Sequence, residues 1–114
     1  KNYLKKEKIW FKETEDLDSV LNQIDCLYVT RVQKERFKSQ DDYEAVKNAY
    51  VVSGKTLKKL KKGAIIMHPI PRVHEISQEV DKYPRAVYFK QAKNGLYIRM
   101  ALLHLIFNGH EKNK

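Results

Sequence analysis

Apolar residues gather in three short runs along the chain. The runs cover residues 9–11, 26–30 and 64–67, and each is nearly continuous rather than alternating with polar residues. Continuous apolar runs of this length are typical of strands that are covered on both faces, as in a parallel sheet. We therefore expect three buried strands, with Cys26 an inert buried thiol in the second.

Between these runs, several segments have the features of helices. Apolar residues at positions 17, 20, 21 and 24 predict a helix that Thr14 caps. Ser39 begins a second predicted helix, and Ser53 begins a third, which is rich in lysine and stops at Gly63.

The C-terminal part opens with a proline-containing loop at residues 68–72 and continues with two predicted helices. Pro84 suits the first turn of a helix that runs to about residue 91. Residues 94–107 predict a long helix whose apolar side covers a wide arc, more than a small sheet would bury.

Strands and helices alternate in this order, which predicts an α/β fold. We expect three layers, with a mainly parallel sheet flanked by helices. Three strands make a thin sheet, and the last helix has more apolar surface than that sheet can cover. Both features indicate an incomplete fold that a partner or a further portion of chain completes.

Composition narrows the class of protein. A chain of 114 residues with 42% apolar residues is long enough for one domain with a core, and its composition is that of a globular protein. No apolar run approaches the ~18 residues of a membrane span, and no secretory segment follows the basic start. One cysteine allows no internal disulfide.

The net charge is the open question from composition. Lys and Arg number 23 and Asp and Glu 14, so the formal charge is 23 − 14 = +9. This balance indicates an anionic partner such as nucleic acid, or else solvated lysine-rich helix faces. The lysine-rich run at residues 58–62 lacks interleaved aromatic residues, which favours the solvated face.

Two loops leave the carboxyl ends of predicted strands, where α/β sheets bind ligands. In the first loop, Arg31 and Gln33 would point the same way in extended chain and offer a guanidinium and an amide. Glu35 could hold that guanidinium in place. The alternative is that these residues cap the following helix and face water.

The second loop, residues 68–72, contains two prolines. Each proline disfavours a helical conformation in the residue before it, and neither has an N–H. Some carbonyl oxygens in such a loop lack internal partners, and these suit a ligand that donates N–H groups, such as a carbamoyl or amide NH₂. A plain rigid turn is the alternative. His68 and His74 have no third ligand nearby, so we expect no zinc site.

Four blocks of sequence resemble the aspartate carbamoyltransferase family, in its order and at about its spacing. They are TRVQKERF at residues 30–37, HPIPRVHEI at 68–76, PRAVYFKQ at 84–91 and NGLYIRMALL at 94–103. The histidine-proline-x-proline-arginine form points to aspartate, since ornithine enzymes typically place cysteine after that histidine. The resemblance implies that residues 1–92 form the C-terminal part of an aspartate-binding domain. It also implies that residues 93–114 form a helix packing back toward a carbamoyl-phosphate domain that this chain lacks.

The resemblance also implies roles for individual residues. Arg31 would bind an aspartate carboxylate with help from Gln33, and Glu35 would orient Arg31. The carbonyls of Pro69 and Ile70 would accept hydrogen bonds from the carbamoyl NH₂. Pro71 would fix the bend through a cis bond, and Arg72 and Glu75 would brace the loop. Ile70 stands where the family usually has leucine, and His74 where an acidic residue is frequent.

The reaction implied by the resemblance is transfer of a carbamoyl group from carbamoyl phosphate to L-aspartate, in pyrimidine biosynthesis, with no metal or organic cofactor. It implies a cytoplasmic homotrimer of longer catalytic chains, with regulatory chains in some relatives, and no nucleic-acid or membrane partner. We expect the 114-residue chain alone to be inactive. The alternative is a non-catalytic fragment or a basic binding module of the same fold.

Overall fold

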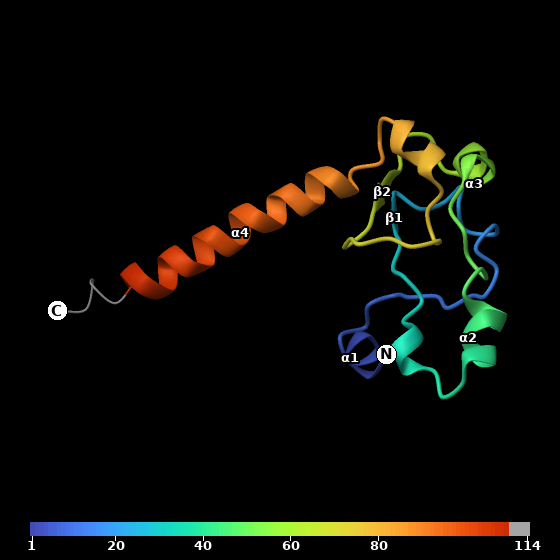
Figure 1. Cartoon of the computed structure of the whole chain (residues 1–114), viewed down its shortest axis with the longest axis horizontal. Helices are drawn as coiled ribbons and strands as arrows, with labels where there is room; N and C mark the ends of the chain where they lie inside the picture. Colours follow the sequence, from blue (N-terminus) through green and yellow to red (C-terminus); the bar gives the residue numbers. More distant parts are fainter. Residues whose placement is uncertain (110–114) are drawn as a thin grey trace.

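The computed structural model describes residues 1–109, and its centre is a pair of parallel strands (Figure 1). Strand β1 (Cys26–Tyr28) runs beside β2 (Ile65–Met67), with Leu27 opposite Ile66. Helices surround this pair, so the predicted α/β class with a parallel sheet is confirmed. The last five positions of the predicted 93–114 segment lie outside the described residues.

Within residues 1–109, six helical elements accompany the strands. They are α1 (Asn2–Lys6), the 3₁₀ helix η1 (Lys34–Arg36), α2 (Gln40–Val46), α3 (Gly54–Lys59), the 3₁₀ helix η2 (Gln78–Lys82) and α4 (Tyr88–Asn108). The predicted cap of α2 is confirmed, because the Ser39 hydroxyl accepts a hydrogen bond of 3.1 Å from the Asp42 N–H. Helix α3 ends before Gly63, which takes φ +94° in the turn that leads into β2.

The far edge of β2 is occupied by residues 85–87 rather than by a helix. The Ile66 N–H donates to the Arg85 carbonyl, and the Val87 N–H donates to the Ile66 carbonyl, both at 2.9 Å. In a parallel ladder alternate residues face opposite edges, so the backbone of Ile66 needs partners on the side away from β1. The predicted helix start at Pro84 is therefore wrong, and residues 88–91 belong to α4, a single helix that starts at Tyr88.

The predicted strand at residues 9–11 and the predicted buried thiol are also wrong. No strand pairs with residues 9–11 within the described chain, and Trp10 is 84% exposed. An apolar run becomes a strand only where a neighbouring strand takes its backbone hydrogen bonds. Cys26 is exposed because β1 is covered on one face only.

The segment predicted to be the first helix forms a series of turns. The Ser19 hydroxyl donates to the Asp16 carbonyl at 2.8 Å, and the Ser19 N–H donates to the Asp16 carboxylate at 3.2 Å. Such local bonds compete with the helical ladder. The predicted apolar side still faces the core, since Leu21 is fully buried and Leu17 and Ile24 pack against it.

A small core lies around β2. Its buried members are Leu21, Val52, Leu60, Ala64, Ile66, Ile76, Val80 and Tyr88. Helix α4 reaches this core only at its first residue and then extends away from the rest of the chain (Figure 1). Its apolar side chains are more than half exposed at Leu96, Ile98, Met100, Leu102, Leu103, Leu105, Ile106 and Phe107. None of the described helices has both the length and the apolarity that crossing a bilayer requires.

Tyr88 fixes the start of α4 through a polar cluster as well as through burial. Its hydroxyl donates to the Asp81 carboxylate on η2, and Arg72 pairs with the same carboxylate. Arg72 also donates to the Tyr88 hydroxyl at 3.2 Å. Burial and the hydrogen bond to Asp81 together raise the pKa of Tyr88 to about 12.

The core predicts a contrast between two leucine truncations. Leu21→Ala should lower the free energy of unfolding of this chain by about 2–5 kcal/mol, because it leaves a cavity in the core. Leu102→Ala is the matched control on α4 and should change it by no more than about 0.5 kcal/mol, because Leu102 is already 53% exposed. Urea denaturation followed by circular dichroism measures both. Equal losses would show that the core is not where the structure puts it.

The Tyr88 cluster predicts a loss of stability in alkali. Unfolded tyrosine ionises near its ordinary pKa of about 10, whereas folded Tyr88 keeps its proton to about 12. The folded state then binds more protons than the unfolded state, so stability falls as the pH rises through this window. Absorbance titration should show a tyrosinate step near pH 12 that Tyr88→Phe removes and Tyr97→Phe, on the exposed part of α4, leaves in place. A late step that survives Tyr88→Phe would contradict the assignment.

Candidate binding site

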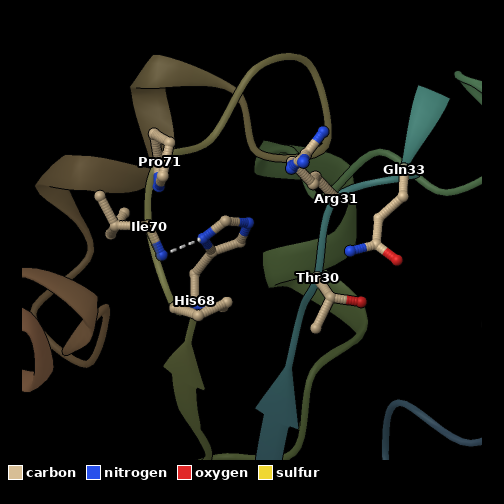
Figure 2. A pocket seen from close by; sticks show the side chains of 7 residues that line it. Thr30, Arg31, Gln33, His68, Ile70 and Pro71 are labelled. Carbon is tan, nitrogen blue, oxygen red and sulfur yellow. Dashed lines mark hydrogen bonds between the residues drawn. The ribbon is translucent and has the colours of Figure 1, made fainter. Parts of the chain in front are cut away.

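Two loops meet at one edge of the sheet because β1 and β2 are parallel. The chain leaves β1 after Tyr28 and β2 after Met67, so both loops start at the same edge. Between them lies a cavity of about 290 Å³ (Figure 2). It is lined by Thr30, Arg31 and Gln33 from the first loop and by residues 68–71 from the second. The structure thus brings together the two segments that the sequence singles out.

Arg31 is held by its neighbour Glu35. Its Nη2 lies 2.5 Å from one Glu35 carboxylate oxygen, and its Nη1 lies 3.2 Å from the other. The Glu35 N–H and the guanidinium of Arg31 keep the pKa of that carboxyl below its usual value. Within residues 1–109 the guanidinium has no other hydrogen-bond partner, so three of its five N–H donors remain for a ligand.

Gln33 lines the same cavity from the position two residues beyond Arg31. It precedes η1, and its carbonyl accepts the Arg36 N–H at 3.0 Å. Its backbone is extended, with φ −83° and ψ 97°. The guanidinium of Arg31 and the amide of Gln33 therefore line the same cavity from positions two residues apart.

The backbone of the second loop has two unusual features. The Ile70–Pro71 peptide bond is cis, and Ile70 takes φ +52°. A left-handed conformation costs an L-residue about 1–2 kcal/mol, and β-branched isoleucine rarely adopts it. Within the described chain, no donor bonds the carbonyl oxygens of Pro69 or Ile70. This segment therefore offers free acceptors in a conformation that its surroundings must hold.

His68 connects this loop to Glu75. The Ile70 N–H donates to His68 Nδ1 at 2.8 Å (Figure 2), and His68 Nε2 lies 2.7 Å from Glu75 Oε1. Both side chains are buried, with 1% of His68 and 5% of Glu75 exposed. The backbone N–H of His68 donates to Gln91 Oε1 on α4 at 3.0 Å.

The Glu75 carboxylate is satisfied on both oxygens. Oε2 accepts the N–H groups of Val73 at 3.2 Å and of His74 at 3.0 Å, while Oε1 faces His68. Burial alone would raise the pKa of this carboxyl. The backbone N–H groups and His68 outweigh that effect and hold the pKa below its usual value. Glu75 thus remains a charged anchor beneath the loop.

Some predicted site residues lie outside the cavity. Glu75 is buried behind the loop, and Arg72 points to Asp81 and Tyr88 rather than to the cavity. Both connect the loop to the body of the chain. The described residues contain no cluster of three or more His, Cys, Asp or Glu side chains that could hold a metal ion.

The sequence did not single out every residue that the structure places here. Thr30 and His68 line the cavity, although only their loops were proposed. Arg99 lines a second cavity of about 410 Å³, which Pro69 and Ile70 share with α4. The two prolines indicated a stiff loop, but no local pattern in the sequence joins His68 to Ile70 or brings Arg99 close.

Known sequences resemble this chain over most of its length. The aspartate carbamoyltransferase catalytic subunit of Clostridium acetobutylicum is 52% identical over 103 residues, which are 90% of this chain and 34% of that protein. Multifunctional protein pyr1-3 of Dictyostelium discoideum is 53% identical over 96 residues, 84% of this chain and 4% of that protein. The chain thus spans about a third of the length of the bacterial relative.

Solved structures give the same result for the fold. The catalytic subunit of M. Jannaschii aspartate transcarbamoylase matches with a TM-score of 0.82 and 45% identity, covering 96% of this chain and 35% of that one. The Trypanosoma cruzi aspartate transcarbamoylase in complex with carbamoyl phosphate matches with a TM-score of 0.76 and 36% identity, covering 90% and 33%. The model of the family described as aspartate/ornithine carbamoyltransferase, Asp/Orn-binding domain, matches residues 1–106. This chain therefore belongs to the aspartate/ornithine carbamoyltransferase family, in the part that the Asp/Orn-binding domain describes.

Proposed function

We propose that this chain is the aspartate-binding part of an aspartate carbamoyltransferase. The complete enzyme transfers the carbamoyl group of carbamoyl phosphate to the amine of L-aspartate and yields N-carbamoyl-L-aspartate and phosphate. The observation that carries the proposal is the shared cavity, where Arg31 and Gln33 face the carbonyl-bearing segment of residues 68–71. The family resemblance and the names of the relatives support the choice of aspartate.

Each side of the cavity suits one reactant. Arg31, with three free N–H donors, binds a carboxylate of aspartate, and Gln33 contacts a second polar group of the same substrate. Glu35 orients the guanidinium. The carbonyl oxygens of Pro69 and Ile70 accept hydrogen bonds from the carbamoyl NH₂, and Pro71 sets the bend of this loop. Arg72 and Glu75 connect the loop to the body of the chain.

These contacts would act by positioning the two substrates. The neutral amine of aspartate attacks the carbamoyl carbon, and a tetrahedral intermediate forms. The carbon–oxygen bond then breaks, and the leaving phosphate takes up the proton that the amine nitrogen loses. Holding both reactants in line removes much of the entropic cost of a bimolecular reaction. The donors and acceptors described here orient aspartate and the carbamoyl group. The phosphate needs cationic groups that a carbamoyl-phosphate domain would supply.

Completing the enzyme requires partners. We propose that residues 1–92 belong to the aspartate-binding domain and that residues 93–114 pack toward a carbamoyl-phosphate domain, with longer chains assembling as a cytoplasmic homotrimer. The exposed apolar side chains along α4 support this proposal, because such a surface needs a cover in a stable protein.

A chimera tests the proposed function. This chain would replace the matching third of the Clostridium acetobutylicum catalytic subunit, to which it is 52% identical. The chimera should form N-carbamoyl-L-aspartate from carbamoyl phosphate and L-aspartate in a colorimetric assay, and the 114-residue chain alone should not. A folded chimera without activity would exclude the proposed function.

Arg31→Ala in this chimera should raise the KM for aspartate and lower kcat. The loss in kcat/KM should be about 10- to 100-fold, as expected when a charged hydrogen-bonding partner is removed from a carboxylate. Arg36→Ala is the matched control, since Arg36 is exposed and does not line the cavity. Steady-state kinetics at varied aspartate concentration measure both. If Arg31→Ala behaves like Arg36→Ala, Arg31 does not bind the substrate.

A further inference from the structure

His68 is a buried titratable group that lines the cavity and that the proposed reaction leaves without a role. It lines the cavity, yet both of its ring nitrogens are engaged, Nδ1 by the Ile70 N–H and Nε2 by Glu75. A ring with neither nitrogen free is poorly placed to exchange a proton with a substrate. His68 instead contacts the backbone of the loop whose carbonyl oxygens are proposed to bind the carbamoyl group.

Hydrogen-bond chemistry fixes the tautomer of His68. A backbone N–H can only donate, so Nδ1, at 2.8 Å from the Ile70 nitrogen, must carry a lone pair. The ring proton then sits on Nε2 and is donated to the Glu75 carboxylate at 2.7 Å. Glu75 is kept in place and ionised by two backbone N–H groups, so it selects this tautomer.

The geometry of the peptide bond links the Ile70–His68 hydrogen bond to the direction of the Pro69 carbonyl. The Ile70 N–H and the Pro69 carbonyl belong to one planar trans peptide unit and point in opposite directions. Anchoring the N–H on His68 therefore fixes the direction of the Pro69 carbonyl. The same bond helps to hold Ile70 at φ +52°, which isoleucine would otherwise leave.

We propose that His68 is a positioning residue for carbamoyl transfer, which acts by holding the Ile70 N–H so that the Pro69 carbonyl stays aimed at the carbamoyl NH₂. Glu75 selects the His68 tautomer that can do this. The inference rests on the proposed function for its substrate, but the hydrogen bonds on which it depends are independent of that substrate.

Two variants of His68 distinguish the roles of its two ring nitrogens, because each variant can keep only one of the two hydrogen bonds. In His68→Asn the amide oxygen can replace Nδ1 as acceptor for the N–H two residues on, and the bond to Glu75 is lost. In His68→Gln the longer amide can replace Nε2 as donor to Glu75, and the acceptor for Ile70 is lost. Each variant loses one of the two ring bonds, so a purely structural role predicts similar effects.

The positioning role predicts different kinetics for the two variants in the chimera. His68→Gln should raise the KM for carbamoyl phosphate about tenfold and lower kcat about tenfold, as expected for one hydrogen bond lost from the loop. His68→Asn should stay within about twofold of the unsubstituted chimera. The KM for aspartate should change less than about twofold in both, because Arg31 lies on the other loop. Equal kinetics for the two variants would overturn the proposal.

A spectroscopic measurement keeps the test decisive if either variant fails to fold. Long-range ¹H–¹⁵N correlation spectra of the unsubstituted 114-residue chain report which ring nitrogen of His68 bears the proton. We expect the proton on Nε2 and an unprotonated Nδ1, whereas a proton on Nδ1 would overturn the proposal. An inactive unsubstituted chimera would count against the proposed function alone, since the tautomer is read without substrate.

Discussion

Parallel pairing of two three-residue strands is the constraint on which the candidate site depends. Because β1 and β2 run in the same direction, the loops that follow them emerge at one edge, although 37 positions separate Arg31 from His68 in the sequence. The pairing is short, and the bonds between Ile66 and residues 85–87 extend it by a further set of backbone hydrogen bonds. The second loop is then tied to the start of α4 through Arg72, Asp81 and Tyr88. Any loss of strand register would separate the cationic side of the cavity from its carbonyl-bearing side.

The distribution of apolar surface divides the described residues into two parts. In the part of the chain that the structure describes, eight buried apolar residues form the core, while a comparable number on α4 remain more than half exposed. Burial of apolar area is the main favourable contribution to folding, so a helix with this much exposed apolar surface gains little from its own chain. The structure therefore separates a locally satisfied part around β2 from a helix whose apolar side chains stay largely uncovered within the described residues.

Sequence patterns predicted the parts of the structure that depend on local chemistry. The Ser39 cap, strands β1 and β2, and the meeting of the Arg31 and His68 loops follow from side-chain type, continuous apolar runs and the rule for parallel sheets. Patterns failed where a partner elsewhere in the fold decides the outcome. Residues 9–11 have no neighbouring strand in the described chain, and residues 85–87 pair with Ile66 instead of starting a helix. The turns around Ser19 arose from side-chain bonds to Asp16, which apolar spacing does not reveal.

The conformation of Ile70 illustrates why a strained residue can serve a binding loop better than a relaxed one. Glycine would adopt φ +52° without steric cost, but it would also populate many other conformations, and the carbonyl before it would lose its fixed direction. Isoleucine has fewer accessible conformations than glycine, and its side chain packs against the core, so the left-handed state is held by packing on one side and by His68 on the other. Strain of this kind persists only where the surroundings over-determine the backbone. The buried His68–Glu75 pair contributes to that surrounding structure, although the Glu75 carboxylate does not line the cavity.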